Sequence, residues 1–206
     1  MQSKQHWESV YAGNPADRVS WYQPHAALSM RLIAEAGIAP DGEIIDVGGG
    51  ASTLVDDLLD AGHRAITVLD LSGAALATAK ARLGPREGAI RWIEGDVTRV
   101  ELARHRYDLW HDRAVFHFLT DPADRAAYRA QVLRAVKPGG HVVMATFAED
   151  GPSECSGLPV MRYSPGRLHA EFGAAFELLE HRREEHRTPS GARQAFVYCF
   201  CRRLTS

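Results

Sequence analysis

The sequence lacks the segments that direct a chain into or across a membrane. No run approaches the roughly 18 consecutive apolar residues that a membrane helix needs. The start, from Met1 to Glu8, has no apolar core of a signal peptide, so we expect none. The three cysteines, Cys155, Cys199 and Cys201, are few and odd in number. That usage is typical of reduced thiols, and we expect a cytoplasmic protein without a membrane partner.

An excess of positive charge is also missing. Lys plus Arg is 24 and Asp plus Glu is 26, which gives a formal net charge of −2. A chain without a basic surplus is poorly suited to a phosphate backbone, so we expect no nucleic-acid partner. Cys199 and Cys201 share one face of a strand, but no further Cys or His completes a metal site, and we predict no metal.

What the sequence does contain is a regular alternation of strand-like and helix-like segments. Five apolar strands are predicted at 43–47, 65–69, 89–93, 107–110 and 141–147, with helices at 52–61, 72–83, 100–104, 121–136 and 164–172. Segments 176–181 and 195–201 then read as an antiparallel hairpin around 188–191. We therefore expect an α/β protein with a doubly wound, mostly parallel seven-stranded sheet that ends in a C-terminal antiparallel hairpin, in a single domain over 1–206.

A glycine run follows the first strand, in Asp46-Val-Gly48-Gly49-Gly50. In a doubly wound sheet, ligands bind beyond the carboxyl ends of the strands, and glycines let the backbone approach them. A dinucleotide fingerprint would need a third glycine at Thr53, which disfavours an NAD(P)-dependent oxidoreductase. The carboxylate of Asp46 suits a ligand with an ammonium group and repels a pyrophosphate. S-adenosylmethionine (SAM) has such an amino-acid end.

Acidic residues also end the second and third strands. Asp70, followed by Leu71 and the helix-capping Ser72, can accept both hydroxyls of a ribose, although a carboxylate here could also serve the helix dipole. Asp96 can accept from an exocyclic adenine amine while the N–H of Val97 meets a ring nitrogen. The alternative for Asp96 is an ordinary Gly-Asp turn.

Together, the segments Asp46-x-Gly-x-Gly, Asp70, Gly95-Asp96 and Lys137-Pro-Gly-Gly140 resemble the class I SAM-dependent methyltransferases. The resemblance covers nearly the whole chain and implies a Rossmann-like methyltransferase fold, with SAM as cofactor and S-adenosylhomocysteine (SAH) as product. It also implies that residues 1–40 form a helical cap over the cofactor. The cofactor-binding residues it implies are Trp21, Tyr22, Asp46, Gly48, Gly49, Gly50, Ser52, Asp70, Leu71, Ser72, Asp96 and Val97.

Charged residues gather after the fourth predicted strand, where the acceptor should lie. We predict His111, Asp112, Arg113 and His117 as catalytic, with a solvated loop as the alternative for Arg113 and a buried, hydrogen-bonded (satisfied) histidine as the alternative for His117. The Asp112-Arg113-Ala114 step resembles thiopurine and thiol methyltransferases, and also the elongation-factor lysine methyltransferases. Ala114 replaces the glycine of both. We expect a small-molecule acceptor, such as a thiol or other soft nucleophile; the alternatives are a protein lysine and a SAM-binding module without catalysis.

Other residues are assigned around this site by position. Trp7 is expected in the core, whereas Trp21 and Tyr22 fit either the core or a lid over the cofactor. Arg162 and Tyr163 are predicted acceptor contacts. The loop at 154–159 is a further candidate for the pocket, with Cys155 as a buried, inert thiol.

Overall fold

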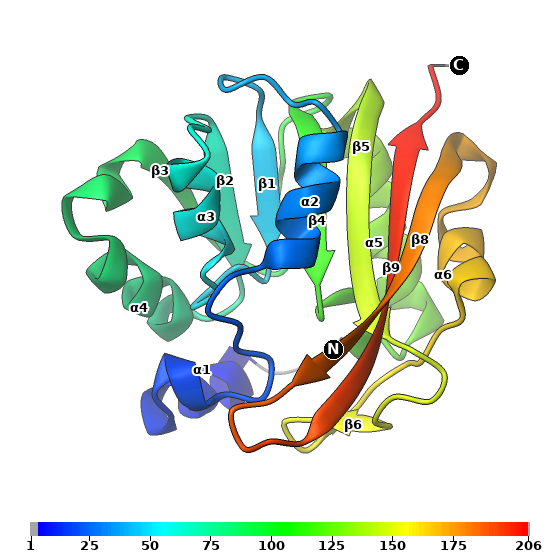
Figure 1. Ribbon diagram of the computed structural model, residues 1–206. Coiled ribbons are helices and arrows are strands. Elements are labelled where there is room, and N and C mark those ends of the chain that lie inside the picture. The colour runs from blue at the N-terminus through cyan, green and yellow to red at the C-terminus, as the bar shows by residue number, and fades with distance from the viewer. Residues whose placement is uncertain (1–3, 206) are drawn as a thin grey trace.

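The computed structural model describes residues 4–205; residues 1–3 of the predicted 1–40 cap, and Ser206, lie outside the described part. Seven strands form one sheet in the order β3-β2-β1-β4-β5-β9-β8 (Figure 1). The strands from β3 to β5 run parallel, and β9 pairs antiparallel with both β5 and β8. The predicted fold class is confirmed, including the antiparallel ending.

The elements follow the chain in the predicted alternation. The strands of the sheet are β1 (Ile44–Val47), β2 (Ile66–Asp70), β3 (Ile90–Glu94), β4 (Tyr107–Arg113), β5 (Val136–Phe147), β8 (Phe176–Arg187) and β9 (Arg193–Arg203). The α-helices are α1 (Lys4–Gly13), α2 (Ala27–Glu35), α3 (Leu54–Asp60), α4 (Gly73–Leu83), α5 (Pro122–Ala135) and α6 (Pro165–Phe172). No helix within residues 4–205 is both long and apolar enough to pass through a membrane.

Apolar side chains cover both faces of the sheet. All four residues of β1 are buried, because alternate side chains enter opposite layers. Ile44 packs in the layer that holds apolar residues of α2, α3 and α4. Ile45 packs in the other layer, with residues of α5 and α6. The carboxyl ends of β1 to β4 meet at one edge of the sheet, where α1 also lies (Figure 1). This is the edge at which we expect a ligand to bind.

Three local predictions were wrong. The helix expected at 100–104 is irregular chain. The loop expected at 154–159 contains a two-stranded hairpin, β6 (Glu154–Cys155) with β7 (Leu158–Pro159). The turn expected at 137–140 is a bulge in β5: Tyr107 pairs with Val136, but Leu109 pairs with His141.

Strand β4 also ends later than predicted, at Arg113 instead of Trp110. This difference matters for the site, because consecutive residues of a strand point to opposite faces of the sheet. His111, Asp112 and Arg113 therefore belong to two layers, and they do not form one cluster in a loop.

Candidate functional site

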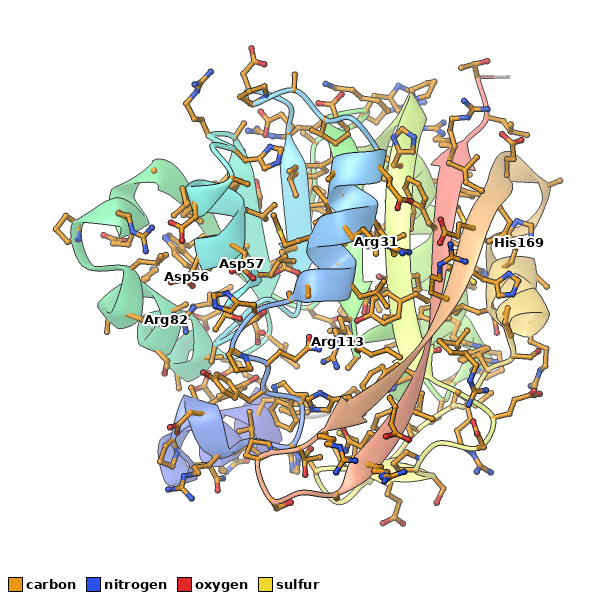
Figure 2. The ribbon with its side chains drawn as sticks, viewed as in Figure 1. Arg31, Asp56, Asp57, Arg82, Arg113 and His169 are labelled. Atoms are coloured by element: carbon orange, nitrogen blue, oxygen red, sulfur yellow. The ribbon has the colours of Figure 1, made fainter. Side chains whose placement is uncertain are left out.

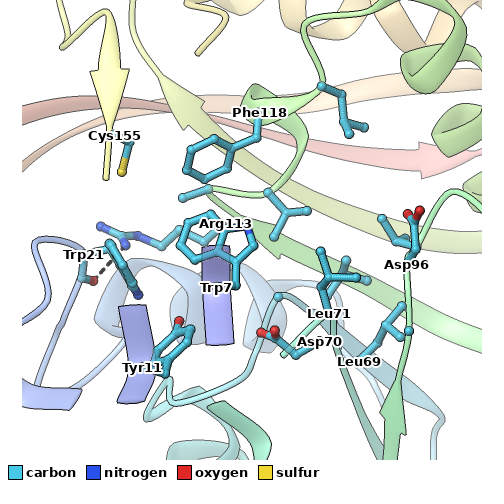
Figure 3. Close-up of a pocket in the computed structure, with 17 residues that line it drawn as sticks. Trp7, Tyr11, Trp21, Leu69, Asp70, Leu71, Asp96, Arg113, Phe118 and Cys155 are labelled. Atoms are coloured by element: carbon cyan, nitrogen blue, oxygen red, sulfur yellow. Dashed lines mark hydrogen bonds between the residues drawn. The ribbon is translucent and has the colours of Figure 1, made fainter. Parts of the chain in front are cut away.

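Two adjoining cavities open at the carboxyl ends of the parallel strands. The larger lies between the strand ends and α1, and Figure 3 shows its lining. It is lined by Trp7, Tyr11, Trp21, Val47, Gly48, Leu69, Asp70, Leu71, Gly95, Asp96, Val97, Arg113, Ala114, Val115, Phe118, Leu119 and Cys155. The smaller is lined by Ala16, Val19, Trp21, Tyr22, Gln23, Ala26, Asp46, Val47, Gly48, Gly49, Ala51, Ser52, Thr53, Leu54, His111 and Arg113.

The three glycines after β1 make room for the groups around them. Gly48 has a φ of +70°, a conformation that side-chain-bearing residues rarely adopt. A Cβ on Gly49 would lie 2.4 Å from Oδ2 of Asp46. A Cβ on Gly50 would lie 2.5 Å from Oδ2 of Asp70. The glycine run thus brings the loop backbone against two carboxylates, which a larger residue at either position would displace.

Asp46 lies in the sheet with only 2% of its surface exposed, and it lines the smaller cavity. Its Oδ1 accepts a hydrogen bond from Nδ1 of His111 at 2.7 Å. Its Oδ2 is buried, and nothing within residues 4–205 donates a hydrogen bond to it. A buried carboxylate oxygen without a hydrogen-bond donor costs free energy unless a ligand supplies the donor. An ammonium group in the smaller cavity would supply that donor.

Asp70 ends β2 and lines the larger cavity beside Tyr11 (Figure 3). Its Oδ1 accepts from the backbone N–H of Ser72 at 2.8 Å, while Ser72 caps α4 through Ala75 as predicted. Burial raises the pKa of Asp70 to about 7, and the hydrogen bond from Ser72 opposes that rise. A carboxylate with spare acceptor sites at a cavity wall can receive two hydroxyl groups.

Asp96 holds the turn after β3 and faces the same cavity. Its Oδ1 accepts from the backbone N–H and the hydroxyl of Thr98 at 2.9 and 2.8 Å. Its Oδ2 is buried and receives no hydrogen bond within the described chain, although Nε of Arg99 lies 3.6 Å away. Val97 lines the cavity next to it. The turn and the ligand interpretations of Asp96 are compatible, because each uses a different oxygen.

An aromatic wall closes these cavities from the N-terminal side. Trp7 and Tyr11 come from α1, and Trp21 from the loop before α2. Trp7 packs edge-on against Trp21, with ring centroids 5.8 Å apart, and Tyr11 does so at 6.1 Å. Trp7 was expected in the core but lines the larger cavity, while Trp21 lines both cavities and Tyr22 the smaller one.

Arg113 borders both cavities and lies between the start of α2 and the crossing of β8 and β9 (Figure 2). Its guanidinium donates to the Tyr198 hydroxyl at 2.9 Å, to the carbonyl of Trp21 at 3.2 Å and to Glu184 at 3.3 Å. It also stacks over the ring of Phe196 at 4.2 Å. The guanidinium has five N–H groups and donates three hydrogen bonds to the protein, so N–H groups remain that can donate to a ligand.

Asp112 faces the opposite layer from Arg113, and its placement corrects the expectation that it reaches the acceptor. It is fully buried and accepts from the Tyr128 hydroxyl at 2.5 Å and from the N–H groups of Val115 and Phe116 at 2.9 and 3.1 Å. Burial raises the pKa of Asp112 to about 6, against the hydrogen bond from Tyr128. The carboxylate holds the chain after β4 in place, and it lines neither cavity.

The two histidines predicted beside it are buried as well. His117 is fully buried, its Nδ1 accepts from the N–H of Phe147 at 3.3 Å, and burial together with Arg113 lowers its pKa to about 3. It lines neither cavity and is buried, as the alternative expected, but its Nε2 has no hydrogen-bond partner within residues 4–205, so the histidine is only partly satisfied. His111 lines the smaller cavity and is hydrogen-bonded to Asp46, which lines the same cavity.

Arg162 and Tyr163 do not reach the cavities, contrary to the prediction of acceptor contacts. Arg162 donates to the carbonyl of Gly151 in an exposed loop. Tyr163 is buried, donates to Glu171 at 3.2 Å and pairs with Ala148 just after β5, and it lines neither cavity. Cys155, by contrast, lines the larger cavity, and burial raises the pKa of its thiol to about 11.

Two charged residues that sequence reasoning missed brace the site. Glu8 on α1 accepts from the N–H groups of Gly73 and Ala74 at the start of α4, which ties α1 over the larger cavity. Arg82 on α4 donates to the carbonyls of Ala51 and Ser52, as well as to a carboxylate of α3 (Figure 2). Neither has a local sequence signal, because the contacts join segments 26–66 positions apart.

Metal-binding chemistry leaves no sign in the described part of the chain. Between residues 4 and 205, no three His, Cys, Asp or Glu side chains come together in a group that could hold an ion. Cys155, Cys199 and Cys201 are all buried as free thiols.

The chain is similar to known methyltransferases in sequence. Residues 44–140 match a family described as "Methyltransferase domain". A curated relative, the mouse eEF1A lysine and N-terminal methyltransferase, is 22% identical over 153 residues, which is 71% of this chain and 22% of that protein. The chain therefore spans less than a quarter of the length of this relative.

Solved structures share the fold over almost the whole chain. One, from a study of the conversion of a disulfide bond into a thioacetal group during echinomycin biosynthesis, has a TM-score of 0.78 at 18% identity and covers 98% of this chain and 93% of its own. Another is the Burkholderia thailandensis 1,6-didemethyltoxoflavin-N1-methyltransferase with bound substrate and SAH, with a TM-score of 0.69 at 20% identity, covering 98% and 84%.

Proposed function

We propose that this chain is a class I SAM-dependent methyltransferase and that it transfers a methyl group from SAM to a small-molecule acceptor with a soft nucleophile, such as a thiol. The observation that carries this proposal is the row of three acids at neighbouring strand ends, Asp46, Asp70 and Asp96. All three line one of two adjoining cavities, and Asp46 and Asp96 each keep a buried oxygen without a donor within residues 4–205.

The described residues fit the cofactor in its three parts. Asp96 and Val97 would receive the adenine, and Asp70, with Leu71 beside it, the ribose hydroxyls. Asp46 and the glycine loop would receive the amino-acid end, with Ser52 also in the smaller cavity. Gly50 and Ser72 serve indirectly, by leaving room for Asp70 and by capping α4.

The reacting end then falls where the two cavities meet, because Trp21, Val47, Gly48 and Arg113 line both. SAM, when bound, supplies an electrophilic methyl group on a sulfonium. Aromatic faces such as that of Trp21 attract a cation. The helical cap proposed for the N-terminal forty residues would exclude water through Trp7 and Tyr11, with Glu8 holding it to α4.

The acceptor would enter the part of the larger cavity lined by Trp7, Phe118 and Cys155. That part offers apolar surface, the thiol of Cys155 with its raised pKa, and the permanently charged Arg113. None of these groups is suited to take a proton from an amine or alcohol. An acceptor that is already nucleophilic needs no base, and a thiolate beside Arg113 is of this kind.

The alternative is a protein lysine acceptor, which the eEF1A-directed relatives bring to attention. A lysine ammonium must lose a proton before it can attack. The candidate bases Asp112 and His117 are buried away from both cavities, so this alternative has less support in the site.

The proposal is tested with methyl-labelled SAM and a matched panel of acceptors: an aryl thiol, the corresponding phenol and aniline, and a lysine peptide. We expect label in the thiol product, at a rate that rises with pH towards the pKa of the thiol. Label in the aniline or the peptide alone would contradict the thiol assignment. No transfer to any acceptor, together with no binding of SAH, would contradict the enzyme assignment.

A further inference from the structure

A buried chain of hydrogen bonds lies beneath the smaller cavity. His111 joins Asp46 through Nδ1 at 2.7 Å and Ser29 through Nε2 at 2.8 Å. All three residues are 1–3% exposed, and they lie on β4, β1 and α2 respectively. These hydrogen bonds therefore join β1 and the preceding helix α2 through His111, which lies far from both in sequence.

The direction of these bonds follows from the chemistry of the groups. An ionised carboxylate only accepts, so Nδ1 of His111 donates to Oδ1 of Asp46. The Ser29 hydroxyl engages the second ring nitrogen, and a ring held at both nitrogens cannot turn. One oxygen of Asp46 is thereby used, and the plane of its carboxylate is set.

The second oxygen of Asp46 is left without a donor within residues 4–205. It lies beside Gly49, where a Cβ would come within 2.4 Å of it, in the loop that borders the smaller cavity. A pair that served only to stabilise the fold would gain from satisfying both oxygens, because a buried acceptor without a partner costs free energy. Asp46 instead keeps one oxygen without a donor at the wall of the smaller cavity.

We infer that His111, with Ser29 behind it, is a positioning residue that holds Asp46 so that its free oxygen receives the ammonium group of SAM. The inference rests on the proposed function, and it removes His111 from the acceptor side of the site. It also distinguishes His111 from His117, which is equally buried but touches no cavity-facing carboxylate.

The test compares two probes by titration calorimetry: SAH, and its desamino analogue, which keeps the carboxylate and lacks the ammonium group. The ratio of their affinities measures what the ammonium contributes. In His111→Leu, the donor to Asp46 is lost, and this ratio should fall about tenfold, the lower end for a hydrogen bond to a charged group. His111→Asn, whose amide nitrogen can replace Nδ1, should retain most of the ratio.

Ser29→Ala leaves His111 in place and should lower the ratio by a smaller factor, so it decides the matter if His111→Leu does not fold. The matched control is His117→Leu, which removes a histidine of similar burial and should keep the wild-type ratio even where stability falls. A wild-type ratio in both His111→Leu and Ser29→Ala would overturn the inference while leaving the proposed function intact. Failure of the wild-type protein to bind SAH would instead overturn the proposed function.

Discussion

The ends of β1 to β3 and the end of β4 carry similar acids in different situations. At the first three, Asp46 and Asp96 each keep a buried oxygen without a donor, and Asp70 faces a cavity. At the fourth, Asp112 receives three hydrogen bonds from its own chain and lines no cavity. The carboxylates at β1 to β3 can still accept hydrogen bonds from a ligand, whereas the carboxylate of Asp112 accepts its hydrogen bonds from the protein itself.

The comparison teaches that a charged residue at a strand end is informative only when its partners are known. Asp112 and Arg113 are neighbours in sequence, yet one anchors the chain after β4 and the other borders both cavities. Because β4 runs to Arg113, the alternation of a strand separates them. Substitutions in the two groups should therefore act on different properties, stability in one and ligand affinity in the other.

The largest effect is expected at Asp112. Asp112→Ala would leave Tyr128 and two backbone N–H groups buried without their acceptor, which should lower the free energy of unfolding by about 3 kcal/mol. The midpoint of urea denaturation measures this loss, and SAH affinity of the folded fraction should stay near the wild-type value. Unchanged stability combined with lost methyl transfer would restore Asp112 to the acceptor site.

Asp70 should show the opposite behaviour. Asp70→Asn removes charge-assisted hydrogen bonds worth about 1.5–3 kcal/mol, so SAH affinity should fall roughly 10- to 150-fold at pH 8. Since the folded pKa is about 7, wild-type affinity should rise between pH 6 and 8 as the carboxyl ionises, while the variant stays flat. Calorimetry at several pH values measures both, with the exposed Asp150→Asn as control. An affinity that is independent of pH in the wild type would contradict the ribose assignment.

Stability should change with pH in a related way. The folded pKa of Asp70 lies above its ordinary value of 3.8, so between about pH 4 and 7 the folded state binds more protons than the unfolded state. The free energy of unfolding therefore falls as pH rises through this window. Asp70→Asn removes that part of the fall, and the ligand-free variant should be more stable than the wild type above pH 7.

Much of this arrangement could be predicted from sequence because its signals are local. The glycine run after an apolar strand, the acids at strand ends and the Ser72 cap each occupy a few consecutive residues. The roles at 111–113 could not be predicted, because they depend on where β4 ends: in a loop these three side chains could gather, whereas in a strand they alternate between the two faces of the sheet. Contacts such as Glu8 with α4 depend on tertiary folding and have no periodic pattern.

The smallest effect is expected at Trp21, which lies in the aromatic wall. Trp21→Phe should weaken SAM binding more than SAH binding, because only SAM carries the sulfonium, by up to about 2 kcal/mol. Stability should change little, since Trp21 is only partly buried. Trp92→Phe is the matched control: Trp92 is also partly buried, on β3, outside both cavities. An equal loss for SAM and SAH would show that Trp21 contributes packing alone.

The most direct test of the account is a titration of the wild-type protein with SAH and, separately, with NADH. The row of acids that suits an ammonium group and a ribose should repel a pyrophosphate. We therefore predict saturable binding of SAH and none of NADH. At a hundred times its dissociation constant, SAH should add about 2.7 kcal/mol to the free energy of unfolding, which a thermal shift would report. Binding and stabilisation by NADH, with none by SAH, would contradict the account.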